Sequence, residues 1–155
     1  MSWREIRSQA DADALMEAFG GFHDACLREL HLWTDHYVEP DLSMSCPGHL
    51  DTRARVLIQR QFRDPSAIEL FFDEITRFNL VATPENYDSI IFTASLVVLE
   101  REIFWSPEED WAPDLPNRDR YSYIAARQLR WRSVSDWMGS SLRYGPGLPG
   151  GERPG

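Results

Sequence analysis

The chain has 155 residues, of which 43% are hydrophobic, 25 are acidic and 16 are basic, so that its net charge is -9. All 16 basic residues are Arg, because the sequence contains no Lys. A chain of this length folds as a single domain with a hydrophobic core and needs neither a metal ion nor a disulfide to do so. A net negative field opposes general binding to nucleic-acid backbones and favours basic partners.

Two features of the sequence bear on its cellular location. No stretch approaches the roughly 20 consecutive apolar residues that a membrane span needs, and the first residues, MSWREIRSQADAD, include no apolar run of signal-peptide type. We therefore expect a cytoplasmic protein that does not enter a membrane. In a reducing compartment, Cys26 and Cys46 are expected to be free thiols.

The chain begins with a helical segment and then changes to β-type sequence. Residues 9–19 combine good helix formers with Asp in the first turn, and Gly20-Gly21 ends them, which predicts one N-terminal helix. The segments that follow are rich in β-branched and aromatic residues and are mostly separated by Pro, Asn or Asp. They predict strands over 25–33, 52–62, 67–75, 89–100, 102–105 and 121–134.

Two long loops separate these strands. Residues 34–51 are either functional or contain an extra short strand around 42–45, and residues 106–120 are acidic and rich in Pro. The Gly- and Pro-rich residues 139–155 are expected to form a flexible tail behind a single domain over residues 1–138. The order of elements predicts an α+β fold, mainly antiparallel β in one sheet or two packed sheets, with the N-terminal helix covering one end.

Several segments carry a family resemblance that covers residues 12–134. In chain order they are FGGFHDACLREL, DLSM, VLIQRQFRDPSAIELFF, ENYDSIIFTASL, IFW and AARQLRWR. This order resembles a family of small bacterial proteins whose function is not established, and in general style it is similar to the immunity proteins of bacterial toxin systems. The resemblance implies a compact β-rich domain without established catalytic residues.

The second long loop is a candidate partner-binding surface. It places the carboxylates of Glu108, Glu109, Asp110 and Asp114 around Trp111. An exposed aromatic side chain would supply a binding hot spot, and the carboxylates would steer a basic protein towards it. The alternative is a solvated loop in which Trp111 folds back onto the core.

Charged residues that interrupt apolar strand faces are a second kind of candidate. Glu29, Arg60 and Arg127 each lie in line with apolar residues of their predicted strands. A charge at a core-facing position must be paired or must line a cavity, so these residues could form a small-ligand or enzymatic pocket with His23 and Asp24. The alternatives are that the faces reach the rim of the sheet, that the Arg side chains extend to solvent, and that His23 and Asp24 only hydrogen-bond the turn before their strand.

Two half-motifs give a third candidate site. HDAC contains His23 and Cys26, and CPGH contains Cys46 and His49, with two residues between the members of each pair. Four such ligands can hold a structural zinc ion. The alternative is that Cys26 lies in the core and His49 belongs to an ordinary loop.

A fourth pattern is a basic strand face. Arg53 and Arg55 alternate on one predicted strand, and Arg130 and Arg132 alternate on another. RNA-binding sheets combine such a row with aromatic residues on the same face, but Trp131 alternates away from Arg130 and Arg132. A solvated strand face is therefore the favoured interpretation, and we expect no nucleic acid as a partner.

These patterns together favour a non-enzymatic protein-binding module that neutralises a basic partner, in the manner of an immunity protein. No nucleophile-elbow motif, phosphate-binding loop or metalloprotease motif occurs, so we expect no catalytic residue and no cofactor. The small-ligand or enzymatic pocket and the structural zinc site remain open as alternatives.

Overall fold

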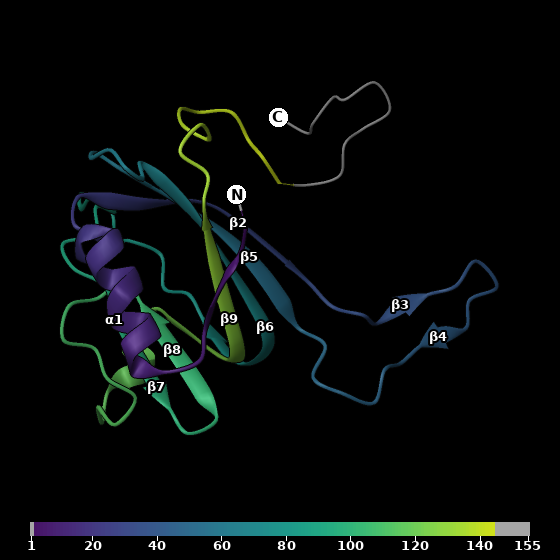
Figure 1. Cartoon of the computed structure of the whole chain (residues 1–155). Helices are drawn as coiled ribbons and strands as arrows, with labels where there is room; N and C mark the ends of the chain where they lie inside the picture. Colours follow the sequence, from purple (N-terminus) through teal and green to yellow (C-terminus); the bar gives the residue numbers. More distant parts are fainter. Residues whose placement is uncertain (1, 145–155) are drawn as a thin grey trace.

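The computed structural model describes residues 2–144 and consists of one large antiparallel sheet, a helix packed on one of its faces and a small separate hairpin (Figure 1). The predicted fold class, mainly antiparallel β with an N-terminal helix, is confirmed. In chain order the elements are β1 (Arg4–Ile6), α1 (Gln9–Ala18), a 3-10 helix (Gly20–Phe22), β2 (Ala25–Trp33), β3 (Tyr37–Val38), β4 (Met44–Ser45), β5 (Arg53–Arg60), β6 (Ala67–Asn79), β7 (Ser95–Leu99), β8 (Glu102–Ser106), a second 3-10 helix (Arg118–Arg120) and β9 (Tyr123–Ser133).

The strand order of the large sheet makes two strands share one edge of β9. The order is β2-β5-β6-β9-β8-β7, and all neighbours are antiparallel. In addition, β1 pairs with residues 129–131 of β9, whereas β8 pairs with residues 124–126. Since β6 occupies the other edge of β9, β1 and β8 together act as one interrupted strand. The interruption lies beside Arg127 and Gln128.

The helix α1 has a defined start and covers the free edge of β7. The Ser8 side chain accepts the backbone N–H of Asp11, and the Asp11 carboxylate accepts that of Ser8. The amide of Gln9 bonds to β7 as a neighbouring strand would. The backbone N–H of Val98 donates to Gln9 Oε1 (2.8 Å), and Gln9 Nε2 donates to the carbonyl of Leu96 (3.1 Å). This pairing blocks an edge that would otherwise be open to another strand.

The main core lies between α1 and the sheet. Ala12 and Leu15 of the helix are fully buried and pack with residues from β5, β6 and β9. Gly20 and Gly21 turn the chain from the helix towards β2 with φ of +58° and +67°, values that favour glycine. A Cβ on Gly20 would lie 2.9 Å from the guanidinium of Arg60, which would have to move to admit it.

The opposite face of the sheet is covered by residues 134–144, which we call the strap. The Glu29 carboxylate accepts the backbone N–H groups of Arg143 (2.8 Å) and Tyr144 (2.7 Å). Tyr144 is 7% exposed, and its hydroxyl donates to Glu69 (2.7 Å). Burial, assisted by the hydrogen bond to Glu69, raises the pKa of Tyr144 above its usual value. The hydroxyl therefore stays protonated and remains a donor.

The carboxylate of Glu69 is the centre of this covered face. It is 0% exposed although it carries a charge. Arg55 Nε and Arg132 Nε each donate to it at 2.8 Å, and these bonds compensate a charge that would otherwise be costly to bury. The same two guanidiniums lie over aromatic rings, Arg55 over Tyr144 (5.0 Å) and Arg132 over Trp3 (4.6 Å).

The basic strand face that the sequence predicts to be solvated is therefore largely covered. Its aromatic residues come from segments other than the two strands that carry the Arg residues. They are Trp3 before β1, Trp33 at the end of β2, Phe71 in β6 and Trp137 in the strap. Because guanidiniums of this face are engaged by rings and by Glu69, the face is chiefly a means of holding the strap.

Several predicted boundaries differ from the observed ones. β1 is absent from the predicted strands, because three residues are too few to show an alternating pattern. The predicted strand over 89–100 is only β7, since the residues before it form no more than an isolated bridge, between Ile91 and Ala25, and place Ile91 and Ala94 in the core. The first residues of the predicted tail, 139–144, belong to the strap, in which Tyr144 packs against Leu57 and Ala67. The rest of the predicted tail, 145–155, lies outside the described residues.

Replacing Glu69 by Gln should destabilise the fold, because it leaves two guanidiniums without their carboxylate. Loss of one member of a fully buried ion pair costs about 3–5 kcal/mol. Arg55 and Arg132 are 32% and 24% exposed, so water relieves part of this cost. We expect a loss of about 2–3 kcal/mol in urea unfolding.

The exposed Glu109→Gln exchange is the control for this measurement and should stay within about 0.5 kcal/mol of the wild type. A Glu69→Gln variant as stable as the Glu109→Gln variant would show that the Glu69 network does not hold the strap face.

Candidate functional site

Residues 34–51 leave the large sheet between β2 and β5 and form a projecting hairpin, which we call the arm (Figure 1). Its strands are β3 and β4, in which Tyr37 pairs with Ser45 and Val38 pairs with Met44. Within residues 2–144, no further strand joins this two-stranded sheet. The prediction of an extra short strand around 42–45 is confirmed by β4.

The tip of the arm is a three-residue turn of Pro40, Asp41 and Leu42. The backbone N–H of Leu42 donates to the carbonyl of Glu39 (2.8 Å), and the N–H of Glu39 donates to the carbonyl of Ser43 (2.8 Å). The Asp41 carboxylate accepts both the hydroxyl (2.5 Å) and the backbone N–H (2.9 Å) of Ser43. These bonds, the hydroxyl first, lower the pKa of Asp41. The turn is thus a defined structure with a charged carboxylate.

Large apolar side chains of the arm are exposed. Leu42 at the tip is 83% exposed, the highest value for a large apolar side chain among residues 2–144. Tyr37 (56%), Val38 (54%) and Met44 (58%) are also more than half exposed. A two-stranded hairpin has no core in which to bury such residues. Val38 and Met44 face each other across the two strands, and exposed apolar side chains that cluster in this way mark surfaces that a partner covers.

The formal charges of the arm are all negative. Between β2 and β5 the chain carries Asp35, Glu39, Asp41 and Asp51 and contains neither Arg nor Lys. Apolar residues interspersed with carboxylates alone make a surface that attracts a basic protein and repels an acidic one.

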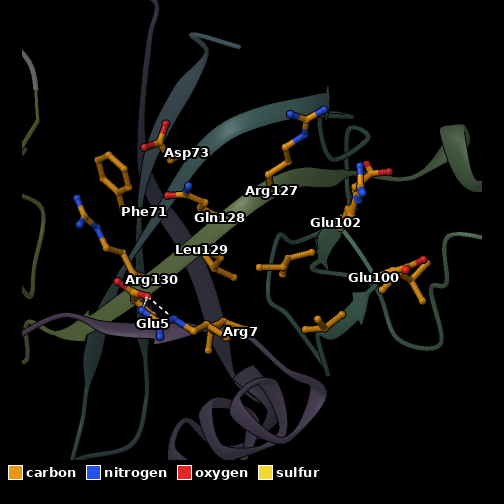
Figure 2. Close-up of a pocket in the computed structure, with 15 residues that line it drawn as sticks. Glu5, Arg7, Phe71, Asp73, Glu100, Glu102, Arg127, Gln128, Leu129 and Arg130 are labelled. Atoms are coloured by element: carbon orange, nitrogen blue, oxygen red, sulfur yellow. Dashed lines mark hydrogen bonds and ion pairs between the residues drawn. The ribbon is translucent and has the colours of Figure 1, made fainter. Parts of the chain in front are cut away.

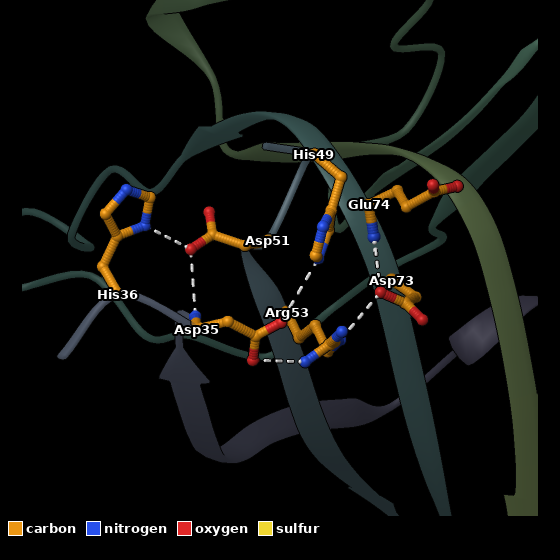
Figure 3. Close-up of polar contacts among 7 residues, drawn as sticks. All are labelled: Asp35, His36, His49, Asp51, Arg53, Asp73 and Glu74. Carbon is orange, nitrogen blue, oxygen red and sulfur yellow. Dashed lines mark hydrogen bonds and ion pairs between the residues drawn. The ribbon is translucent and has the colours of Figure 1, made fainter. Parts of the chain in front are cut away.

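An ion-pair network attaches the arm to the sheet (Figure 3). Arg53, at the start of β5, donates to Asp35 of the arm (2.7 Å) and to Asp73 of β6 (3.0 Å). These hydrogen bonds, with Asp35 first, raise the pKa of Arg53. Asp73 also accepts the backbone N–H of Glu74 (2.8 Å). The base of the arm is thereby tied to two neighbouring strands.

Asp51 and two histidines tie the two legs of the arm to each other (Figure 3). Asp51 accepts the backbone N–H of Asp35 (2.9 Å) and the Nδ1 of His36 (2.6 Å). Because an ionised carboxylate can only accept, Nδ1 of His36 carries the proton. His49 Nε2 lies 3.4 Å from the Asp35 carboxylate. The hydrogen bond from His36 is the main cause of a pKa of Asp51 below its usual value.

The acidic loop predicted to bind a partner keeps its carboxylates at the surface but does not expose its aromatic residue. Trp111 is only 3% exposed. Its ring stacks on Tyr123 (4.6 Å between centroids), and its Nε1 donates to the carbonyl of Arg118 (3.2 Å). Trp111 therefore belongs to a small core, and the prediction that it is an exposed anchor is wrong. The carboxylates of Glu108, Glu109, Asp110 and Asp114 are exposed.

The residues predicted to form a pocket do not converge on one site, and two of them form a turn at the start of β2. His23 Nδ1 lies 2.8 Å from the carbonyl of Phe92, and its Nε2 lies 3.4 Å from the Asp24 carboxylate. The backbone N–H of Asp24 donates to the carbonyl of Ile91 (3.0 Å). His23 and Asp24 thus hold the chain as it enters its strand.

Glu29 and Arg127 lie elsewhere on the sheet. A bulge in β2 between Leu27 and Glu29 changes the face on which the following residues lie, so Glu29 binds the strap and does not face the core. Arg127 is exposed beside the interruption between β1 and β8. The prediction of one pocket from these residues is therefore wrong.

Arg60 is buried, as expected of a charge at a core-facing position, but its partners are structural. It is 9% exposed and lies 4.5 Å from the ring centroid of Phe19. Its Nε donates to the carbonyl of Pro65 (2.7 Å), and its Nη2 donates to that of Arg63 (3.1 Å). Burial lowers the pKa of Arg60. The guanidinium fixes the turn between β5 and β6.

The predicted zinc ligands lie at opposite ends of β2. His23 and Cys26 are at its start, whereas Cys46 and His49 are in the arm beyond its end. A strand of this length separates the two pairs by roughly 25 Å. Residues 2–144 contain no group of three or more His, Cys, Asp or Glu side chains that could hold a metal ion. The predicted four-ligand site is therefore wrong, and both cysteines are free.

A groove of about 480 Å³ lies at the interruption between β1 and β8 (Figure 2). Its lining includes the buried apolar residues Ile6, Ile103 and Leu129. Its rim carries charges of both signs, of which Glu5 and Arg7 pair with each other. Among the residues that the structure describes, Arg101, Arg127 and Arg130 of the rim form no ion pair. The volume is within the range of small-ligand sites.

Comparison with known proteins identifies no relative of this chain. No family model matches it, and neither a curated protein nor a solved structure is detectably similar. The resemblance to immunity proteins therefore stays a prediction. No helix within residues 2–144 has the length and apolar character required to cross a bilayer.

The apolar residues of the arm are the main feature that the predicted sites omit. In the sequence alone, nothing distinguishes these residues, Tyr37, Val38 and Met44, from the rest of a long loop. The sequence signal that could indicate the hairpin is the segment Glu39-Pro40-Asp41-Leu42-Ser43, in which Pro and Asp favour a tight turn between two short extended segments.

Replacing Asp51 by Asn should weaken the fold in a pH-dependent way. Because the pKa of Asp51 is lowered in the folded protein, its ionised form contributes stability above the ordinary carboxyl pKa of about 3.9. This contribution is lost as the pH falls through the lowered pKa. We expect the wild type to be more stable than Asp51→Asn at pH 7 in urea unfolding, and the difference to shrink below about pH 3.9. A difference that is constant down to pH 2 would contradict this role.

Arg60 and Arg127 should respond differently to replacement by Ala. Arg60→Ala removes charged hydrogen bonds to two carbonyls and should cost about 2–3 kcal/mol. Arg127 is exposed, so Arg127→Ala should stay within about 0.5 kcal/mol of the wild type. Urea unfolding of both variants checks this, and equal losses would show that the two environments are wrongly assigned.

Proposed function

We propose that this protein is a non-enzymatic binding module whose arm binds a basic protein, in the manner of an immunity protein that neutralises a toxin. The observation that supports it is the arm itself. Residues 34–51 project from the sheet with exposed apolar side chains, carry only negative formal charges and are fastened at their base.

The combination of apolar and acidic groups favours a protein partner over a small molecule. No residue of the arm lines the groove between β1 and β8, but the exposed apolar side chains of the arm would lose contact with water in a complex, which is the main favourable term in association. The surrounding carboxylates would accelerate encounter with a basic surface and discriminate against acidic proteins. The loop after β8 carries further exposed carboxylates, Glu108, Glu109, Asp110 and Asp114, on a part of the surface away from the arm (Figure 1).

Neutralising the carboxylates of the arm tests this function. The immobilised wild-type protein is exposed to lysate of its source cells, and retained proteins are eluted with increasing salt and identified by mass spectrometry. Because carboxylates steer a basic partner, the Glu39→Gln/Asp41→Asn variant should release the retained basic protein at lower salt.

The matched control for this experiment is Glu85→Gln/Asp88→Asn, which removes the same two charges from a different exposed loop. Glu108→Ala/Glu109→Ala/Asp110→Ala measures the contribution of the second acidic surface. The proposal fails if no basic protein is retained at low salt, or if all variants and the wild type release it at the same salt concentration.

A second candidate function is the binding of a small anion in the groove between β1 and β8. The specific observation is that the guanidiniums of Arg101 and Arg127 lack ion-pair partners within residues 2–144, beside an apolar floor, whereas Arg130 lies over the ring of Phe71. Thermal unfolding with a panel of organic carboxylates and phosphates tests it. A ligand that raises Tm for the wild type but not for Arg127→Ala would support this function.

A further inference from the structure

The residue at the tip of the arm has a backbone conformation that does not suit its side chain. Leu42 has φ of +74°, in the left-handed region. It is the third residue of a three-residue hairpin turn, following Pro40 and Asp41. In hairpin loops of this kind the third residue adopts the left-handed conformation, and glycine is preferred there because it has no Cβ. Leucine is therefore an unfavourable choice for the turn.

Packing does not explain the leucine. A strained residue persists when the surrounding structure compensates it, yet Leu42 is 83% exposed. Contact of the leucine side chain with water does not stabilise the folded protein either, since the side chain is apolar. Glycine or asparagine would form the same turn at lower cost. The identity of Leu42 thus serves neither the turn nor the core.

The surroundings of Leu42 have the composition of a binding hot spot and its rim. Val38 and Met44 form a cross-strand pair just behind the tip, and both are more than half exposed. Glu39 and Asp41 flank the turn with negative charges. Binding hot spots combine a central apolar anchor with a polar rim.

We propose that Leu42 is the anchor of the arm, and that it enters an apolar pocket of the basic partner whose rim carries guanidinium or ammonium groups opposite Glu39 and Asp41. This proposal rests on the proposed function of the arm and adds to it the residue and the kind of pocket that decide the binding. The cost of placing leucine in the turn is then recovered in the complex.

A second copy of this chain does not fit as the occupant. The chain has a net charge of -9, and the arm offers no Arg or Lys to meet the carboxylates of another arm. Two such surfaces repel each other. Charge complementarity therefore selects a basic protein.

Exchanges of Leu42 separate its role in binding from its role in the turn. The probe is the basic protein that the wild type retains and releases with salt, purified and titrated by calorimetry. Leu42→Gly and Leu42→Asn both suit the left-handed turn but lack the apolar side chain, so each should weaken the Kd by at least about tenfold. Leu42→Met keeps an apolar side chain of similar volume and should stay within a few fold of the wild type.

The matched control is Leu99→Gly, which removes an exposed leucine beside another hairpin turn. Leu99 is 50% exposed and lies at the end of β7. The Kd of Leu99→Gly for the basic protein should equal that of the wild type. In urea unfolding, Leu42→Gly should be no less stable than the wild type, because glycine relieves the strained φ.

The outcomes distinguish the anchor from the function of the arm. Suppose that a basic protein binds the wild type and binds Glu39→Gln/Asp41→Asn more weakly. If it then binds Leu42→Gly as tightly as the wild type, the arm functions without this anchor and the proposal is wrong. If Leu42→Gly is clearly less stable than the wild type, the leucine serves the fold and the proposal is also wrong. If light scattering shows that the wild type is a dimer and Leu42→Gly a monomer, Leu42 binds a second copy of the chain and the proposal of a basic partner is wrong. If no basic protein is retained, the function and the anchor fail together.

Discussion

A hairpin of two short strands has no interior, and this constraint governs the relation between the arm and the rest of the molecule. The large sheet buries apolar residues on both faces, under α1 on one side and under the strap and the loop that carries Trp111 on the other. The arm has no such cover within the described residues, so its apolar groups stay in water unless a partner removes them. The network around Arg53 and Asp51 then determines where those groups are presented.

The distribution of charge follows from the structural roles of the Arg residues. Arg55 and Arg132 neutralise the buried Glu69, and Arg60 binds carbonyl groups under the surface. Because these guanidiniums are used within the large sheet and its covering segments, the projecting parts carry an excess of carboxylates. The arm and the loop after β8 are therefore acidic, while the body needs its positive charges for its own cohesion.

Sequence patterns predict the parts of the fold that depend on local chemistry. The helix from Gln9, the strand over 25–33 and the antiparallel class follow from residue periodicity and from the Gly20-Gly21 break. The site depends on features that periodicity does not contain. A one-residue bulge in β2 moves Glu29 to the strap face, and long-range packing buries Trp111 against Tyr123. The exposure of the arm likewise depends on where the chain leaves the sheet.

Amide hydrogen exchange on the arm tests most directly whether this hairpin is the partner-binding element. In the free protein, the amides of β3 and β4 should exchange much faster than those of β5 and β6, because the hairpin has no cover. When the retained basic protein is added, protection should rise in residues 34–51 and remain unchanged on the strap. Protection that appears on the strap or around the groove, with the arm unchanged, would contradict the account.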